Sequence, residues 1–385
     1  MAHRKAIALI ATTVAAMGLG ACASPAPHPS PSPRASPTPS ALLTLPPSPS
    51  PTPSVPAGFQ PEALSAISDT DFWVLGSTFC ASGQCPPEIF HTIDAGRVFQ
   101  RIPAPPTVSL DGNATAPGLP VVFDLRFADS SDGWVFGDQL WATHDGGSRW
   151  TQVDALGIVS VPQLEPGADG YVYAVFERCT VPSTATGCSF RMERSRAGSD
   201  IWSVIGPPGD PAGLPVIGVH GNTVWVMYFN GSTRAAWISH DEGALWSRGS
   251  MPCYPDLGGS FDPVSVSVIW AFCATGNFGD PWLSTNGGQS FTTSPTYTGE
   301  SSNGAVVVAV SAEHAFIVDP GEATLRVTTD GGRTFQEVPQ MAGAAWGGFT
   351  DSQVGYMITR DPTTSAMRLW RTTDAGTAWT LVRVP

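Results

Sequence analysis

Residues Thr328-Thr-Asp-Gly-Gly-Arg-Thr-Phe335 carry a short sequence pattern that recurs along the chain. The pattern is Ser/Thr-x-Asp-x-Gly-x-x-Trp/Phe, and it is typical of a tight turn. The carboxylate can accept backbone N–H bonds within the turn, and the glycine can adopt the positive φ that the turn requires. Six copies occur, with Asp94, Asp145, Asp241, Asn286, Asp330 and Asp374 in the third position.

A weaker copy runs from Ser195 to Trp202, with Ala197 in the third position. Successive third positions are then 51, 52, 44, 45, 44 and 44 residues apart, which divides residues 59–385 into seven units. A unit of about 47 residues suits a four-stranded propeller blade. Upstream of each pattern lies an apolar, aromatic run, which favours a strand buried on both faces. The runs are at 71–76, 132–137, 170–174, 223–227, 268–272, 314–318 and 355–358.

This pattern resembles the Asp box, or BNR repeat, of β-propellers such as the sialidases, xyloglucan-cleaving hydrolases and photosystem II stability/assembly factor-like proteins. The resemblance implies an all-β, seven-bladed β-propeller over residues 58–385. In that family the box lies on the turn between the third and fourth strands of a blade, on the face away from the ligand site. The resemblance therefore implies that the six Asp and Asn residues are structural. Trp134, Trp225 and Trp270 are expected in the core rather than on a sugar-stacking platform.

The first 57 residues are not expected to fold. Residues 1–21 combine basic Arg4 and Lys5 with an apolar stretch too short to span a bilayer stably, which is typical of a signal peptide. The sequence up to Cys22 resembles a bacterial lipobox, which implies lipidation of Cys22. Residues 22–57 form a Pro/Ser/Thr-rich segment, predicted to be a disordered stalk. We therefore expect an extracytoplasmic lipoprotein on the outer face of the bacterial cytoplasmic membrane.

The charge balance is acidic, with 19 Lys and Arg against 32 Asp and Glu and a net charge of −13. Removal of residues 1–21 also removes two basic residues, Arg4 and Lys5, and no acidic ones, which leaves a net charge of −15. Binding to nucleic acid needs clustered basic residues, so nucleic acid is not an expected partner. The predicted contact with the membrane is through the lipid anchor alone.

Six cysteines remain besides Cys22, an even number in a protein predicted to be exported. Six cysteines allow 15 pairings. Local spacing favours Cys80–Cys85 and Cys179–Cys188, each in a loop between second and third strands, and Cys253–Cys273. These bonds either rigidify binding loops or only protect exposed ones. The chain has no Cys-x-x-Cys motif or His cluster, so neither a metal nor a cofactor is expected.

The face opposite the Asp boxes is the expected binding face. Polar residues near the start of each inner strand are candidates to line its central channel. They are Gln60, Glu62, Asp124, Arg126, Gln163, Glu165 and Asp262. Asp124 and Arg126 are two residues apart and are predicted to share one strand face, whereas Phe123, Leu125 and Phe127 share the other. An ion pair of Asp124 with Arg126 that binds no ligand is the alternative.

Two functions fit these features. The first is a non-catalytic, monomeric binding or assembly module for an envelope or secreted protein, a peptide or a glycan, with no catalytic residues. The alternative is a glycoside hydrolase of the sialidase type. In sialidases an Arg-Ile-Pro motif precedes the first Asp box, but here Arg101-Ile-Pro103 follows a box and is predicted on a fourth strand. The binding module is therefore the favoured function.

Overall fold

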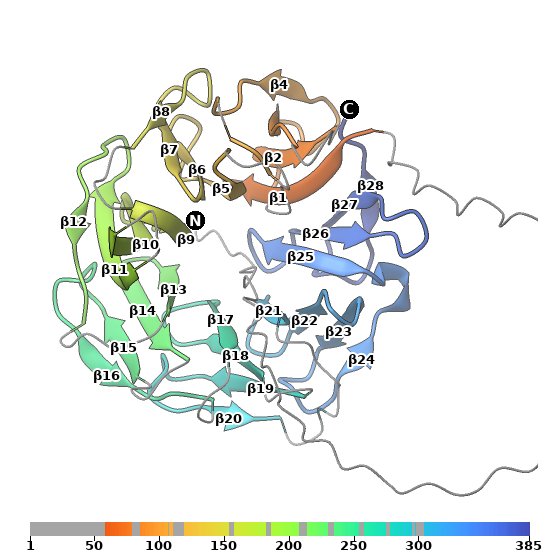
Figure 1. Ribbon diagram of the computed structural model, residues 1–385. Coiled ribbons are helices and arrows are strands. Elements are labelled where there is room, and N and C mark those ends of the chain that lie inside the picture. Colours follow the sequence, from red (N-terminus) through yellow and green to blue (C-terminus); the bar gives the residue numbers. More distant parts are fainter. Residues whose placement is uncertain are drawn as a thin grey trace, which may run out of the picture. The chain divides into compact units, whose positions relative to one another are not determined.

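A ring of seven four-stranded antiparallel sheets, which we number blades 1–7 in chain order, forms the folded part of the protein (Figure 1). The computed structural model describes residues 58–385 except 79–84, 107, 111–118, 154–157, 182–185, 208–213, 230–234, 254–257, 275–277, 295–296 and 298–303. The predicted all-β seven-bladed propeller is confirmed. The predicted signal peptide, lipidated Cys22 and stalk lie outside the described residues. Within those residues, no helix is both long and apolar enough to cross a bilayer.

Each blade uses four consecutive strands, the first nearest the ring centre and the fourth at the rim (Figure 1). Blades 1–3 contain β1 (Gln60–Ala66), β2 (Phe72–Ser77), β3 (Glu88–Thr92) and β4 (Gln100–Ile102); β5 (Val122–Phe127), β6 (Gly133–Gly137), β7 (Leu140–Thr143) and β8 (Thr151–Gln152); and β9 (Ile158–Pro166), β10 (Tyr171–Val181), β11 (Thr186–Arg196) and β12 (Ser203–Val204). Blades 4 and 5 contain β13 (Pro215–His220), β14 (Thr223–Tyr228), β15 (Ala235–Ser239) and β16 (Ser247–Gly249); and β17 (Gly259–Pro263), β18 (Ile269–Ala274), β19 (Gly279–Ser284) and β20 (Thr292–Thr293). Blades 6 and 7 contain β21 (Val306–Ala309), β22 (Ala315–Asp319), β23 (Thr324–Thr328) and β24 (Gln336–Glu337); and β25 (Ala344–Phe349), β26 (Gly355–Arg360), β27 (Met367–Thr372) and β28 (Thr380–Val382), with a 3₁₀ turn, η2 (Pro339–Met341), between these two blades.

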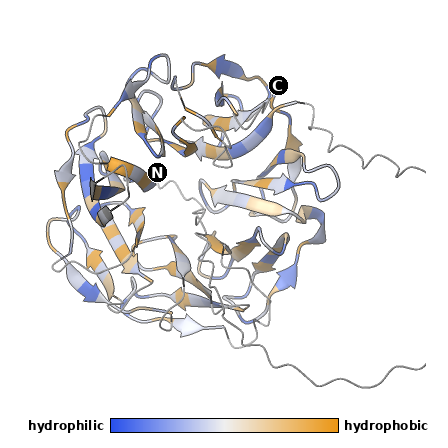
Figure 2. Cartoon of the chain, viewed as in Figure 1, coloured by the Kyte–Doolittle hydropathy of each residue, from blue (hydrophilic) through white to orange (hydrophobic). Residues whose placement is uncertain are grey.

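The core lies between neighbouring blades. Seven clusters of buried apolar side chains each join one pair of adjacent blades. The second strands supply the largest of these side chains, and Trp73, Trp134, Trp225 and Trp270 are at most 1% exposed. By contrast, the rim strands β4, β16 and β24 are largely hydrophilic (Figure 2). The tryptophans of the second strands are therefore core residues, as the aromatic runs predict.

The Asp boxes form turns between the third and fourth strands. In blade 6, Asp330 Oδ1 accepts hydrogen bonds from the Thr328 hydroxyl and the Thr334 backbone N–H, both at 2.9 Å. The Thr328 hydroxyl in turn accepts the Gly332 N–H at 2.9 Å, and Gly332 has a φ of +84°. The pKa of Asp330 is lowered to about 2, mainly because the Thr334 backbone N–H donates a hydrogen bond to its carboxylate. The carboxylate thus serves as an acceptor inside its own turn.

Blade 3 departs from the repeat. Its turn has Ala197 where other blades have Asp, and the Ser195 hydroxyl donates to the Ser199 carbonyl instead. Its second and third strands extend to eleven residues each, and Cys179 and Cys188 pair directly across them in a disulfide. The predicted bond is present, but its predicted place in a loop is wrong, because the extended hairpin keeps both cysteines within strands.

The Cys253–Cys273 disulfide is also present, between the connection that follows β16 and the strand β18. Cys85 is disulfide-bonded, whereas Cys80, its predicted partner, lies outside the described residues. Disulfides are typical of oxidising, extracytoplasmic compartments.

Blades 1 and 7 share no strand, because each is built from four consecutive strands of its own. Side-chain contacts between these two blades therefore close the ring. Gln60 Oε1 accepts the Met367 backbone N–H at 2.7 Å. The Tyr356 hydroxyl and the Arg371 guanidinium both donate to the Asp69 carbonyl, at 3.1 and 3.0 Å. An apolar cluster from both blades packs beside these bonds. These contacts hold the first and the last blade of the ring together.

Candidate functional site

Four adjacent inner strands share a local irregularity. In β1, β5 and β25, one residue stands without a partner on the neighbouring strand: Glu62, Phe123 and Ala345, respectively. In β9, Val161 and Pro162 stand opposite a single residue of β10. The strands β13, β17 and β21 pair with their neighbours without a register shift. Blades 7, 1, 2 and 3 therefore each carry an inner β-bulge, a feature that re-aims side chains and is common beside functional sites.

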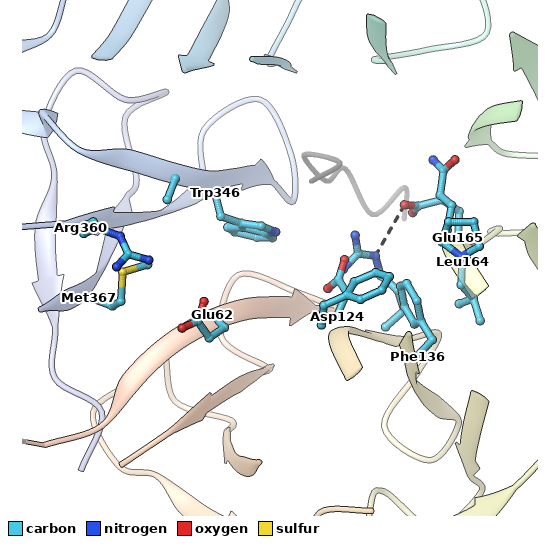
Figure 3. Close-up of a pocket in the computed structure, with 13 residues that line it drawn as sticks. Glu62, Asp124, Phe136, Leu164, Glu165, Trp346, Arg360 and Met367 are labelled. Carbon is cyan, nitrogen blue, oxygen red and sulfur yellow. Dashed lines mark hydrogen bonds and ion pairs between the residues drawn. The ribbon is translucent and has the colours of Figure 1, made fainter. Parts of the chain in front are cut away.

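These bulges surround a pocket of about 210 Å³ between the inner strands of blades 7, 1, 2 and 3 (Figure 3). One residue from each bulge, namely Glu62, Phe123, Pro162 and Ala345, lines it. The remaining lining residues are Asp124, Arg126, Phe136, Gln163, Leu164, Glu165, Trp346, Arg360 and Met367. Because Met367 begins β27 and an Asp box follows the end of that strand, the pocket lies toward the face opposite the boxes.

A buried ion cluster forms one wall of the pocket. The Arg126 side chain is 2% exposed, and its Nη1 lies 2.5 Å from Asp124 Oδ1. The same Nη1 donates to the Leu125 carbonyl at 2.8 Å, and Nε lies 3.6 Å from Glu165 Oε1. Blades 2 and 3 are thus connected by one guanidinium between two carboxylates. A charge buried this deeply is stabilised only by such partners.

The other wall comes from blade 7. Figure 3 shows Trp346, Arg360 and Met367 on the side opposite Asp124 and Glu165. Trp346 is 6% exposed, and its indole Nε1 has no hydrogen-bond acceptor among the described residues. Arg360 is exposed at the end of β26. Arg126 and Arg360, with opposite degrees of burial, supply the positive charge in the lining.

Three of the sequence candidates hold the ring together. The Gln163 amide donates to the Ile217 carbonyl at 2.8 Å and accepts the Ile217 N–H at 2.9 Å, which joins blades 3 and 4. Asp262 Oδ2 accepts the Ala309 N–H at 2.8 Å, which joins blades 5 and 6. With Gln60 at the ring closure, these side chains bond to backbone groups of neighbouring blades, which would otherwise be buried without partners.

The sequence placed Glu62, Asp124, Arg126, Gln163 and Glu165 in one region, and all five line the pocket. Gln60 and Asp262 are not in its lining.

The expected separation of Phe123 from Asp124 and Arg126 is wrong, because the bulge at Phe123 breaks the strict alternation of side chains. Sequence reasoning also missed Trp346, Arg360 and Met367. Arg360 ends the second strand of blade 7 and Met367 begins the third strand. The connection between these two strands lies on the face opposite the Asp boxes, so their position in the repeat could have identified them as residues of that face.

Metal-ligating groups converge at one place in the described residues, where Glu177 approaches Cys179 and Cys188 within 4.8 Å. Both sulfurs belong to the disulfide and are not thiolates, the form that binds metals. This group therefore does not fit a metal ion.

No protein-family model matches the sequence, and no curated protein matches it. The solved structures that are similar in fold include the following three. YCF48 bound to D1 peptide is 15% identical with a TM-score of 0.54, and the match covers 83% of this chain and 95% of that chain. YCF48 from Cyanidioschyzon merolae is 14% identical with a TM-score of 0.53, over 85% of this chain and 98% of that chain. A catalytically inactive virginiamycin B lyase from Staphylococcus aureus is 12% identical with a TM-score of 0.55, over 82% of this chain and 95% of that chain. At these identities, the likeness shows that the chain shares the β-propeller fold with these proteins.

Proposed function

We propose that this protein is a non-catalytic extracytoplasmic binding module that holds a peptide segment of an envelope or secreted protein in the bulge-lined pocket. The observation that carries the proposal is the coincidence of four inner-strand bulges with one pocket. The repeat alone would give seven equivalent inner strands. Bulges confined to the inner strands of adjacent blades are expected where a local binding site, rather than the closure of the ring, determines the strand pairing.

The size and chemistry of the pocket support a peptide. The volume of about 210 Å³ is smaller than the usual range of about 300–1,000 Å³ for pockets that enclose drug-sized ligands. Such a pocket suits one long side chain, with the rest of a peptide on the surface around it. The structural neighbour with a bound peptide, YCF48 with D1 peptide, makes peptide binding by this fold a reasonable expectation.

The rival function, a sialidase-type glycoside hydrolase, would need arginine side chains free to bind the substrate carboxylate. Arg126 is 1% exposed overall and faces Asp124 and Glu165 instead. A substrate carboxylate would have to reach this buried guanidinium past two negative charges, which disfavours its binding. The arrangement therefore favours binding over this hydrolysis.

A random nonapeptide library panned on the purified protein tests the proposal. The Phe123→Asp variant changes a bulge residue in the pocket, and Val266→Asp is the matched control at a residue 53% exposed in a turn of blade 5. We expect the unchanged protein and the control to enrich the same peptides, and the pocket variant to lose them. Failure to enrich any peptide, or equal enrichment by the pocket variant, would contradict the proposal. Turnover of fluorogenic sialosides that is lost in Arg126→Met would establish the rival.

The lipid anchor at Cys22 and the stalk over residues 22–57 complete the proposal, with the propeller held outside the cytoplasmic membrane. Mass spectrometry of the N-terminal peptide tests this part. We expect a peptide that starts at Cys22 and carries the mass of attached acyl chains. An unmodified Cys22 would remove the anchor from the proposal and leave the binding site unaffected.

A further inference from the structure

We infer that the pocket accepts a basic side chain, lysine or arginine, of the bound peptide. This inference rests on the proposed function and names the chemical class of its ligand. Glu62, Asp124 and Glu165 line the pocket, against Arg126 and Arg360, so the lining has a net charge of −1. Because Arg126 is buried between two of the carboxylates, its charge is already matched within the wall. Asp124 and Glu165 together carry one negative charge more than Arg126 neutralises, so the part of the pocket beside them favours a cation.

The aromatic lining supports the same class of ligand. Phe123, Phe136 and Trp346 line the pocket, and aromatic faces attract guanidinium and ammonium groups. The pocket wall already contains one such contact, since Cζ of Arg126 lies 5.9 Å from the centroid of the Phe136 ring. A flexible basic side chain can pack its methylene groups on the aromatic surface and direct its charged end to the carboxylates.

The experiment uses synthetic nonapeptides with the sequence context enriched in the library, changed at one position to Lys, Arg, norleucine, citrulline or Glu. Binding to the purified protein is measured by calorimetry. We expect Lys or Arg to bind at least tenfold more tightly than norleucine and citrulline, which are close to Lys and Arg in length but carry no charge, and than Glu, which reverses the charge. Raised salt should narrow this difference.

Two variants test the residues. Glu62→Gln removes an exposed carboxylate of the pocket, and we expect about fivefold weaker binding of the Lys peptide with unchanged binding of the norleucine peptide. Glu337→Gln, at an exposed residue of the rim strand β24, is the matched control and should leave both unchanged.

Peptides that bind through the pocket without preference for Lys or Arg would overturn this inference and leave the proposed function standing. The same holds for a preference for Glu that is lost in Arg360→Met. If the library yields no pocket-dependent peptide, the proposed function fails and this inference fails with it.

Discussion

Replacement of Asp262 by alanine should weaken the contact between blades 5 and 6. Asp262 is 3% exposed, and its Oδ2 accepts the backbone N–H of Ala309 at 2.8 Å. The Ala309 N–H lies on the inner strand β21, where it has no strand partner on that side. An alanine at position 262 leaves this N–H without its acceptor. The structure therefore assigns a structural role to a residue that the sequence marked as a candidate for binding.

The magnitude follows from the kind of bond that is lost. A hydrogen bond to a charged group contributes about 1.5–3 kcal/mol, and a buried donor left unpaired costs about 1–3 kcal/mol. Since both describe the same bond, we expect a loss of about 2 kcal/mol in the free energy of unfolding. For a folded part of this size, that corresponds to a decrease of about 3 °C in Tm. Asp262→Asn keeps an acceptor oxygen and should lose about half as much.

Thermal unfolding measures the global loss, and hydrogen exchange of the Ala309 amide measures the local one. In Asp262→Ala, exchange protection at Ala309 should fall about tenfold or more, because that amide opens with less cost. Ser260→Ala is a matched variant on the same strand, since the Ser260 hydroxyl accepts the Val307 N–H at 3.0 Å. In Ser260→Ala, exchange protection should fall at the Val307 amide more than at the Ala309 amide. Unchanged stability and unchanged protection at Ala309, with loss of peptide binding instead, would refute the structural role of Asp262.

Three further changes test other parts of the molecule. The pKa of Asp330 is lowered to about 2, mainly by the Thr334 N–H. Its contribution to stability is therefore complete above the unfolded value near 3.8 and lost as pH falls toward 2, so the decline of stability in acid should be shallower in Asp330→Asn. An equally steep decline in that variant would contradict this role, since the carboxylates of the other Asp boxes, whose pKa values are also lowered, would then account for all of it. Gly343 has a φ of +82°, and a Cβ added there would lie 1.9 Å from the Arg360 carbonyl oxygen, so Gly343→Ala should lower the free energy of unfolding by at least about 2 kcal/mol in urea titrations. A Cβ added at Gly304 meets open space, so Gly304→Ala should change this free energy little, and equal effects of the two variants would contradict the prediction. Replacing Cys253 and Cys273 together by serine opens a loop with a sequence separation of 20 and should cost about 3 kcal/mol; a variant as stable as the oxidised protein would show that the bond is not a stabilising one.

The fold could be predicted because its signal is local. In blade 6, the hydrogen bonds of the Thr328 hydroxyl and the Asp330 carboxylate connect residues between Thr328 and Thr334, so a short pattern reports the turn. Repetition at a nearly constant spacing then gives the number of blades. The aromatic runs likewise report their own burial, because a strand buried on both faces is apolar at every position.

The candidate site was predicted only in part, because its contacts connect distant segments. Asp262 bonds to Ala309, 47 residues away, and no local pattern distinguishes this role from binding. Phe123 was assigned to the wrong strand face because a one-residue bulge shifts the alternation on which the assignment depends. Trp346 lies across the pocket from Asp124, at the opposite end of the chain. Sequence reasoning could identify the face of the ring, but not the four strands that depart from regular pairing.

The distribution of irregularities distinguishes features that serve the ring from features that serve a site. Asp boxes recur in six of the seven blades because every blade needs the same turn. Among the strands that the structure describes, inner bulges occur in blades 7, 1, 2 and 3, while β13, β17 and β21 keep regular pairing. If the bulges served ring curvature, the regular blades would need them equally, since each has the same number of strands and similar neighbours. The bulges therefore place the pocket to one side of the ring axis, and a peptide bound there should contact blades 7 and 1–3 while blades 4–6 act as structural support.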